Sequence, residues 1–413
     1  MALIKPFNAI RPKEGLEDKI AALPYDVYSR EEARDKVKDD AYTFLRIDRA
    51  ETQFSEDYDM YAPEVYQKAH DMLWDMIERG EFVQDNKACY YVYEQVMNQR
   101  SQTGIVAASS VDDYLNEVIK KHENTREDKE IDRIKHVDTC NAQTGPIFLA
   151  YRKNNSIEEV INATKENKPV YDFVSDDGIT HRVWIVDNDN DIKVIADAFN
   201  GISEIYIADG HHRCASAVKV CLKRRNEQPD YNGNEEFNYF LSVLFADEQL
   251  MIMDYNRVVK DLNGYTVSEL MDKIAVDFDI VKVENEKDIR PMNKYTIAMY
   301  LDNTWYHITY KGEKSDDPVK KLDVSILQDK LLQPILNIND PKTDKRIDFV
   351  GGIRGIKELE RRVEKDCKIA FLMYPTSIGE LFEVADAGML MPPKSTWFEP
   401  KLRSGLFIHS IKQ

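Results

Sequence analysis

The sequence predicts a mixed α/β (α+β) protein with two domains, and three observations lead to this expectation. The chain has 413 residues, whereas a single hydrophobic core stops growing at about 250 to 300 residues. Short apolar runs typical of strands alternate along the chain with segments whose apolar residues recur at helical spacing. A Leu-Asn-Gly turn at residues 262–264 marks a boundary. We therefore expect one domain over residues 1–262 and a C-terminal α/β domain over residues 263–413.

The early part of the first domain carries clear helix signals. Ser29 followed by Glu32 predicts a capped helix start, and residues 42–47 predict a strand. Residues 61–79 have apolar side chains at helical spacing, and Gly80 predicts the end of that helix. Further strands are expected at residues 88–97, 105–110, 147–151, 170–174 and 180–186, and further helices at residues 157–165 and 191–199.

In one stretch of the first domain an apolar run ends at Asp209 and is followed by Gly210, His211, His212 and Arg213. Small residues come next, so the pattern predicts a strand, a tight turn and a helix N-terminus. Gly210 lets the backbone approach a ligand, and the first N–H groups of the helix point into the turn. With the two histidines and Arg213 as further donors, the expected ligand is a phosphate group.

Asp209 ends the strand, where its carboxylate could orient a nucleophile, take its proton or help to hold a phosphate-bound metal. The alternative is structural: Asp209 caps the helix, the histidines lie on the surface and Arg213 pairs with an exposed carboxylate. Adjacent histidines can also bind a metal, but the segment lacks the thiolates or spaced histidines and carboxylates of a zinc site. We therefore assign no residue as a metal ligand from the sequence.

A second candidate segment is the charged run at residues 120–135. His122, Glu123 and Thr125 precede its helical part, in a place where a loop would present them. Glu123 is the candidate general base of the site. The alternative is a solvated helix face held by Glu–Lys pairs.

The second half of the chain alternates in an α/β manner. Helices are expected at residues 267–276, 324–336 and 378–387, a hairpin at residues 295–310 and a strand at residues 369–374. The glycine cluster at residues 351–355 lacks a following lysine, so a plain turn is favoured over a nucleotide loop.

The tail at residues 391–403 contains three prolines and is expected to be extended rather than helical. Lys394, Lys401 and Arg403 give it local positive charge on an acidic chain. The tail either folds back over the active site or forms a strap anchored by Trp397 and its neighbour Phe398, and the two readings are compatible.

The overall composition of the chain limits the kinds of partner that we expect it to bind. The formal charge of −18, from 56 basic and 74 acidic residues, repels nucleic acid, which is therefore not expected as a partner. The five cysteines are scattered, so neither a disulfide framework nor a zinc module is expected. With no apolar run of about 18 residues and no apolar leader, we expect a cytoplasmic protein without membrane spans. The oligomeric state is left open.

Several motifs resemble known families. Gly210, His212 and Arg213 resemble the Gly-x-His-Arg centre of sulfiredoxins, and Asp209 to Arg213 resemble the phosphate loop of free-serine kinases in the same ParB/sulfiredoxin-like superfamily. Other stretches resemble a bacterial family of that superfamily labelled only as a domain of unknown function (number one thousand and fifteen). These stretches are residues 23–27, 121–125, 129–133 and 391–398.

The resemblance implies a ParB/sulfiredoxin-like nucleotide-binding core in residues 1–262, with the tail closing on the site. It also implies a nucleotide-dependent kinase that phosphorylates a small hydroxyl-bearing metabolite and uses ATP or ADP and Mg²⁺. Free L-serine is the first candidate substrate. Glu123 and Asp209 would be catalytic. The residues expected to bind the nucleotide phosphates are Gly210, His211, His212 and Arg213, and those expected to bind substrate are His122, Thr125, Lys394, Ser395 and Thr396.

Three rival functions remain. A ParB-like nucleotide switch would bind without turnover, but the acidic charge and the lack of a helix-turn-helix pattern count against it. A regulatory protein of amino-acid metabolism would bind a phosphorylated ligand without chemistry. Sulfiredoxin-like repair is nearly excluded, because His211 stands where sulfiredoxins have their catalytic cysteine and Cys214 lies further along the helix.

Overall fold

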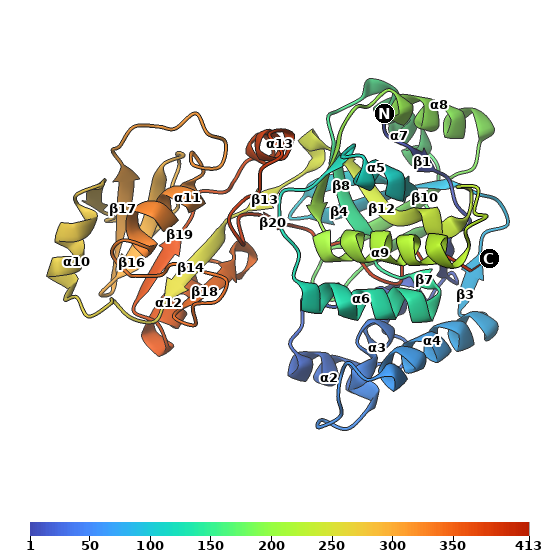
Figure 1. The fold of residues 1–413 in the computed structure, drawn as a ribbon, viewed down its shortest axis with the longest axis horizontal. Helices are drawn as coiled ribbons and strands as arrows, with labels where there is room; N and C mark the ends of the chain where they lie inside the picture. Colours follow the sequence, from blue (N-terminus) through green and yellow to red (C-terminus); the bar gives the residue numbers. More distant parts are fainter. Residues whose placement is uncertain (413) are drawn as a thin grey trace. The chain divides into compact units, whose positions relative to one another are not determined.

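The computed structural model describes residues 1–412. The chain divides into two compact units, Met1–Leu250 with Pro400–Gln413, and Met251–Glu399 (Figure 1). This division differs from the predicted ranges 1–262 and 263–413. The strand β14 (Tyr255–Val259) pairs within the second unit's sheet, and the chain returns to the first unit at residue 400.

The first unit is built on a nine-stranded mixed sheet with the strand order β6-β11-β8-β12-β5-β4-β10-β9, and β1 pairs with β5. The strands are β1 (Ile4–Lys5), β4 (Tyr90–Met97), β5 (Arg100–Ser110), β6 (Ile119–Lys120), β8 (Ile147–Tyr151), β9 (Tyr171–Val174), β10 (Thr180–Val186), β11 (Ile205–Asp209) and β12 (Tyr239–Ala246). Of these, β11 runs parallel to β6 and antiparallel to β8. Two short pairs accompany the sheet, β2 (Ile10–Pro12) with β3 (Phe82–Gln84), and β7 (Ala142–Gln143) with β21 (His409–Ser410).

Helices cover this sheet. They are α1 (Glu17–Ile20), α2 (Arg30–Lys38), α3 (Leu45–Asp48), α4 (Pro63–Glu78), α5 (Val111–Leu115), α6 (Glu127–Cys140), α7 (Asn155–Lys165), α8 (Asp189–Asn200) and α9 (His211–Glu227). Helix α9 packs against β8 and β12, α6 lies beside α9, and α4 packs against α6 (Figure 1). One apolar core joins the sheet to α7, α8 and α9, and a second lies among α2, α3 and α4.

Local signals in the sequence predict many of these elements correctly. The capping box at Ser29 is confirmed, since its hydroxyl accepts the N–H of Glu32 and the Glu32 carboxylate accepts the N–H of Ser29. The helix predicted for residues 61–79 is α4, and Gly80 follows it with a left-handed φ of 72°. The strands predicted at residues 88–97 and 105–110 are β4 and β5, which pair antiparallel, and β5 begins earlier than predicted, at Arg100.

The strand predicted for residues 42–47 is wrong, because these residues lead into the short helix α3. The Asp40 carboxylate accepts the N–H groups of Tyr42 and Thr43 and so starts a turn instead of a strand. Phe44 and Ile47 are fully buried in the core shared with α4. Burial of an apolar run does not distinguish a strand from a short helix.

The second unit has a six-stranded antiparallel sheet with the order β15-β17-β16-β19-β14-β18. Its elements are β15 (Phe278–Lys282), β16 (Thr296–Leu301), β17 (Thr304–Tyr310), β18 (Ile347–Gly351) and β19 (Ile369–Leu372), with α10 (Val267–Ile274), α11 (Asp323–Leu327), α12 (Ile356–Lys365) and α13 (Ile378–Asp386). The predicted helix at residues 324–336 begins as α11 and continues as a π-helical turn, Gln328–Leu332. The glycine cluster forms a plain 3-10 turn, Gly352–Arg354.

The tail is extended, as predicted: β20 (Trp397–Phe398) pairs with β13 (Ile252–Met253) inside the second unit. All five cysteines are buried and free in the described chain. Nowhere in residues 1–412 does a helix combine the length and the apolar character needed to cross a membrane.

Candidate functional site

Two loops of the first unit meet because two neighbouring strands are parallel. Strand β6 pairs with β11 in the register Ile119 with Ile205 and Lys120 with Tyr206. The segments that follow the two strands therefore leave the sheet at the same edge. One carries His122 and the other carries the turn at Gly210.

The turn after β11 requires glycine. Gly210 has φ 91°, in the left-handed region, and a Cβ there would lie 3.1 Å from Nε of Arg213. Gly210 is itself the N-cap position of α9, and no side chain caps this helix. Asp209 therefore does not serve as the N-cap residue, which was the structural alternative for it.

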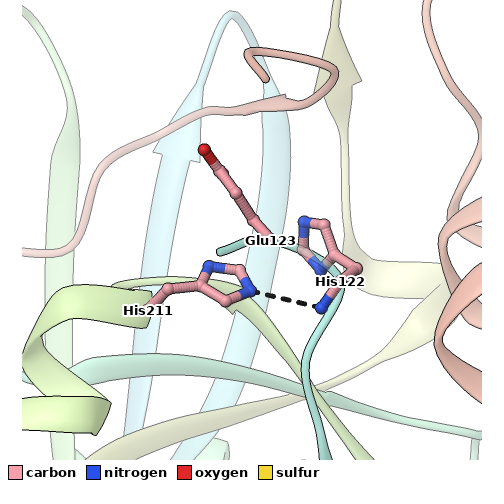
Figure 2. A group of neighbouring side chains, drawn as sticks. All are labelled: His122, Glu123 and His211. Atoms are coloured by element: carbon pink, nitrogen blue, oxygen red, sulfur yellow. Dashed lines mark hydrogen bonds between the residues drawn. The ribbon is translucent and has the colours of Figure 1, made fainter. Parts of the chain in front are cut away.

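Figure 2 shows His122, Glu123 and His211 drawn together by the two loops. The backbone N–H of His122 donates to Nε2 of His211 at 3.5 Å, and the two imidazole rings meet edge to face with centroids 4.5 Å apart. Both rings are buried, while Glu123 is half-buried. The two segments singled out in the sequence thus form one cluster.

Burial controls the charge of these imidazoles. It lowers the pKa of His122 to about 4, although a hydrogen bond with the backbone of Ile207 opposes the shift. It also lowers the pKa of His211 far below its usual value, and the neighbouring His122 adds to that shift. Both rings are neutral at physiological pH.

Asp209 is an ionised carboxylate with close partners. Its Oδ1 accepts the N–H of Gly210 at 2.7 Å, and its Oδ2 accepts from Nζ of Lys401 at 2.9 Å. Burial favours a higher pKa for Asp209, but the charges of Lys401 and Arg213 hold this pKa well below its ordinary value. Asp209 is therefore a weak base in this state.

His212 and Arg213 are both held by backbone groups. Nε2 of His212 accepts the N–H of Arg126 at 2.9 Å, just before α6. The Arg213 guanidinium donates to the carbonyl of Pro146, in the segment between β7 and β8. The two side chains thus tie the start of α9 to its neighbouring loops.

Thr125 lies beside the Glu130 carboxylate, for which the sequence predicted no role. Its hydroxyl donates to Oε1 of Glu130, and Lys219 on α9 pairs with Oε2 of the same residue. Burial would raise the pKa of Glu130, but Lys219 and Thr125 lower it. In this arrangement Thr125 helps to link α6 to α9.

A small cavity adjoins Arg213. Among its lining residues are Tyr25, Asp48, Arg133, Thr144 and Ser404. Arg133 is buried, donates through Nε to Asp132 at 3.0 Å and stacks on the Tyr25 ring, 4.1 Å from its centroid. Asp48 accepts from the Thr144 hydroxyl at 2.9 Å. The cavity wall therefore carries a buried cation and a buried anion.

The predicted substrate residues of the tail belong to the second unit. The Ser395 hydroxyl donates to the carbonyl of Pro392 at 2.6 Å, and the Thr376 hydroxyl donates to the carbonyl of Ser395 at 3.0 Å. The Arg257 guanidinium donates to the carbonyl of Lys394 at 3.0 Å. A role of Lys394, Ser395 and the adjacent Thr396 in substrate binding stays a prediction.

Residues 4–325 match a family described as protein of unknown function (DUF1015). The chain belongs to the DUF1015 family. This confirms the family that the motifs indicated. No protein in the curated set matches the chain.

Three solved structures are similar to this DUF1015 protein at low sequence identity. A free serine kinase in complex with AMP is 13% identical, with 71% of this chain and 86% of that chain covered and a TM-score of 0.35. A conserved hypothetical protein from Pyrococcus furiosus is 16% identical, with coverages of 73% and 93% and a TM-score of 0.35. SbnI with a C-terminal truncation, from Staphylococcus aureus, is 13% identical, with coverages of 75% and 89% and a TM-score of 0.40.

Several residues of this region have no role among the sequence-based predictions. Lys401 was noted for its charge, but its pairing with Asp209 spans 192 positions and no local pattern indicates it. Tyr25 and Arg133 lie in motifs that carried the family resemblance, so a signal was present for them. Asp48 had none, because it directly follows the segment wrongly predicted as a strand and no pattern around it indicates a site.

Proposed function

We propose that this DUF1015 protein is a nucleotide-dependent kinase of a small hydroxyl-bearing metabolite, with free L-serine as the first candidate. One observation carries the proposal: β6 and β11 are parallel neighbours, so a carboxylate, Glu123, borders the glycine turn at the N-terminus of α9. Phosphoryl transfer depends on positioning and charge stabilisation, and this edge of the sheet offers groups for both.

The turn supports phosphate binding. Helix α9 runs from His211 to Glu227, so the N–H groups of its first turn and its dipole favour an anion at the N-terminus. Gly210 keeps the backbone accessible. Arg213 and Lys401 add positive charge close to Asp209. The nucleotide phosphates would bind here.

The two carboxylates suit different tasks. Asp209 is paired with Lys401 and has a strongly lowered pKa, so it is suited to electrostatic positioning rather than to proton uptake. Glu123 lies on the facing loop and is half-buried. It is the carboxylate we assign as the general base for the attacking hydroxyl.

Mg²⁺ fits this turn only in part. The ion prefers oxygen ligands and retains several waters, and it commonly binds through one or two carboxylates together with substrate phosphates. Asp209 is the carboxylate that adjoins the turn. When bound with the nucleotide, Mg²⁺ would neutralise charge on the phosphates.

The cavity beside Arg213 supports an amino acid as the phosphate acceptor. A free α-amino acid carries a carboxylate and an ammonium group, and the cavity wall offers Arg133 for the first and Asp48 for the second. A guanidinium has five N–H donors, so the bond to Asp132 leaves capacity for a second carboxylate. L-serine combines these charges with a short hydroxyl side chain.

The experiment is a turnover screen of the full chain with Mg²⁺, ATP or ADP, and a panel of free amino acids and sugar alcohols. Phosphorus NMR and mass spectrometry would identify the product. We expect O-phosphoserine with L-serine and no product with L-alanine, which lacks the hydroxyl. Tight nucleotide binding without any phosphorylated product would overturn the kinase proposal in favour of a nucleotide-binding switch or regulator.

A further inference from the structure

We propose that His122, Glu123 and His211 form a binding site for a divalent transition-metal ion, for which Mn²⁺ and Zn²⁺ are suitable probes. The proposal does not rest on the kinase activity, because it concerns the side chains alone. Their ligand atoms all lie within 4.8 Å of one another (Figure 2).

The distances between the ligand atoms of the three side chains are close to those found around a bound metal ion. Metal–ligand bonds of about 2.0 to 2.2 Å place neighbouring ligands of one ion roughly 3 to 3.6 Å apart. Two ligand atoms at the 4.8 Å limit would therefore have to approach each other by about 1 to 2 Å. Glu123 lies in the segment between β6 and α6, outside regular structure, and its long side chain can make this adjustment by rotation. Figure 2 shows it extending from the loop that also carries His122.

The donor set selects the kind of ion. Two imidazoles and one carboxylate suit Mn²⁺, Fe²⁺ or Zn²⁺ and leave open coordination positions, whereas Mg²⁺ prefers an octahedron of oxygen ligands. Imidazole binds metal in its neutral form.

The hydrogen bond between His122 and His211 is weak. The N–H of His122 reaches Nε2 of His211 at 3.5 Å, which is at the long limit of a hydrogen bond, so its loss costs little. Glu123 supplies one negative charge to the ion and Asp209 supplies another nearby.

The position of the site indicates which class of small-molecule group a bound ion would attract. His211 is the first residue of α9, so an ion bound to it borders the turn formed by Asp209 and Gly210. The helix N-terminus and the ion's open positions both favour an anionic oxygen ligand. We infer that the occupied site would add affinity for phosphate or carboxylate groups at this turn.

The test is metal binding to the full chain, stripped by chelator and free of nucleotide. Titration calorimetry with Mn²⁺ and with Zn²⁺, together with metal content after dialysis, should give one bound ion per chain that excess Mg²⁺ does not displace. Glu123→Gln and His211→Ala should each weaken binding by at least about tenfold. His212→Ala is the matched control, since it removes an adjacent imidazole outside the cluster, and it should retain binding.

His211 is buried, so its variant is first checked for folding by circular dichroism in the metal-free state. Glu123→Gln preserves shape at a half-buried position, so it decides the question alone if His211→Ala does not fold. Absence of binding to the wild-type chain would overturn the proposal. Equal affinity of wild type and Glu123→Gln, or loss of binding only in His212→Ala, would overturn it as well. None of these readouts depends on kinase turnover.

Discussion

Asp209 has two cationic neighbours, Lys401 and Arg213, whose charges hold its pKa well below the ordinary value of a carboxyl. Glu123 lies across the turn, beside two buried neutral imidazoles. A carboxylate that is firmly ion-paired accepts a proton poorly at neutral pH. This contrast between the two acids leads to the first prediction.

We expect Glu123→Gln to lower the turnover of L-serine by about 10²- to 10⁴-fold, the usual contribution of a positioned general base. Nucleotide affinity should stay near wild type, because the substitution does not touch the turn at Gly210. Single-turnover kinetics and calorimetry would separate the two effects. Glu127→Gln is the control, since Glu127 is an exposed carboxylate in the first turn of α6 and should leave turnover unchanged. Full activity of Glu123→Gln would transfer the base role to another carboxylate.

Arg213 leads to a prediction on affinity. Arg213→Ala should weaken ATP or ADP binding by about 1.5 to 3 kcal/mol, the typical value of a charged hydrogen bond. Arg225→Ala removes an arginine from the same helix, where it pairs with Asp112 at 2.7 Å, and should leave affinity intact. Calorimetry would measure both. Equal affinities of the two variants would mean that Arg213 does not contact the phosphates.

Among the elements, the β11–turn–α9 unit could be predicted in full from sequence, because an apolar run, a glycine and a small-residue helix start follow one another without interruption. The hairpin β4–β5 and helix α4 were predictable for the same reason. Helix α3 was not, because its identity depends on a turn set by Asp40 and on packing against α4. Nor could the meeting of the two loops be predicted, because it depends on the parallel pairing of β6 and β11.

Alanine substitutions at two glycines test the role of the turn in nucleotide binding. Gly210→Ala should destabilise the first unit by about 1 to 2 kcal/mol, because alanine is strained at φ 91°. It should also abolish nucleotide binding, since the added Cβ meets the Arg213 guanidinium. Gly178→Ala introduces similar strain at φ 78° with no atom within 4 Å, so it should cost similar stability and leave binding unchanged. Denaturant melts and calorimetry give the comparison, and nucleotide binding by Gly210→Ala would contradict the assignment.

For the whole molecule, the division into two units was foreseen from chain length, but its boundaries were not. The sequence places a turn at residues 262–264, yet the second unit already begins at Met251 and ends at Glu399. The return of the tail rests on contacts such as the pairing of β21 with β7, which join residues far apart in the chain. Local composition carries no signal for such pairings.

The stabilities of the two units against unfolding should change in opposite directions with pH. In the first unit, burial lowers the pKa of His122 to about 4 and that of His181 to about 3. The unfolded chain then binds more protons between these values and about 6.5, so stability is complete above pH 6.5 and falls as the pH decreases. In the second unit, burial raises the pKa of Asp323 to about 7. The folded form holds the proton there, so stability falls as the pH rises from about 4 through 7.

Asp323→Asn tests the second half of this prediction. Asparagine keeps an oxygen that can accept the N–H of Tyr295, now at 2.8 Å from the carboxylate, and it never ionises. The variant should stabilise the second unit by about 4 kcal/mol at pH 8 and by less than about 1 kcal/mol at pH 4, where the unfolded carboxyl is itself partly protonated. Hydrogen exchange resolved by peptide would report each unit separately. A gain in stability of the same size at both pH values would show that the carboxyl does not titrate in this range.

The first unit is discontinuous, and this has a consequence for biosynthesis. Residues 400–413 leave the ribosome only after the whole of Met251–Glu399 has been made, so the Lys401–Asp209 pair and the β21–β7 pairing cannot form earlier. The second unit is contiguous and can fold during translation, whereas the first lacks the partner strand of β7 and the cation beside Asp209 until the end of the chain has been made. A nascent chain arrested before residue 400 should therefore expose the first unit to chaperones and proteases while the second is already protected.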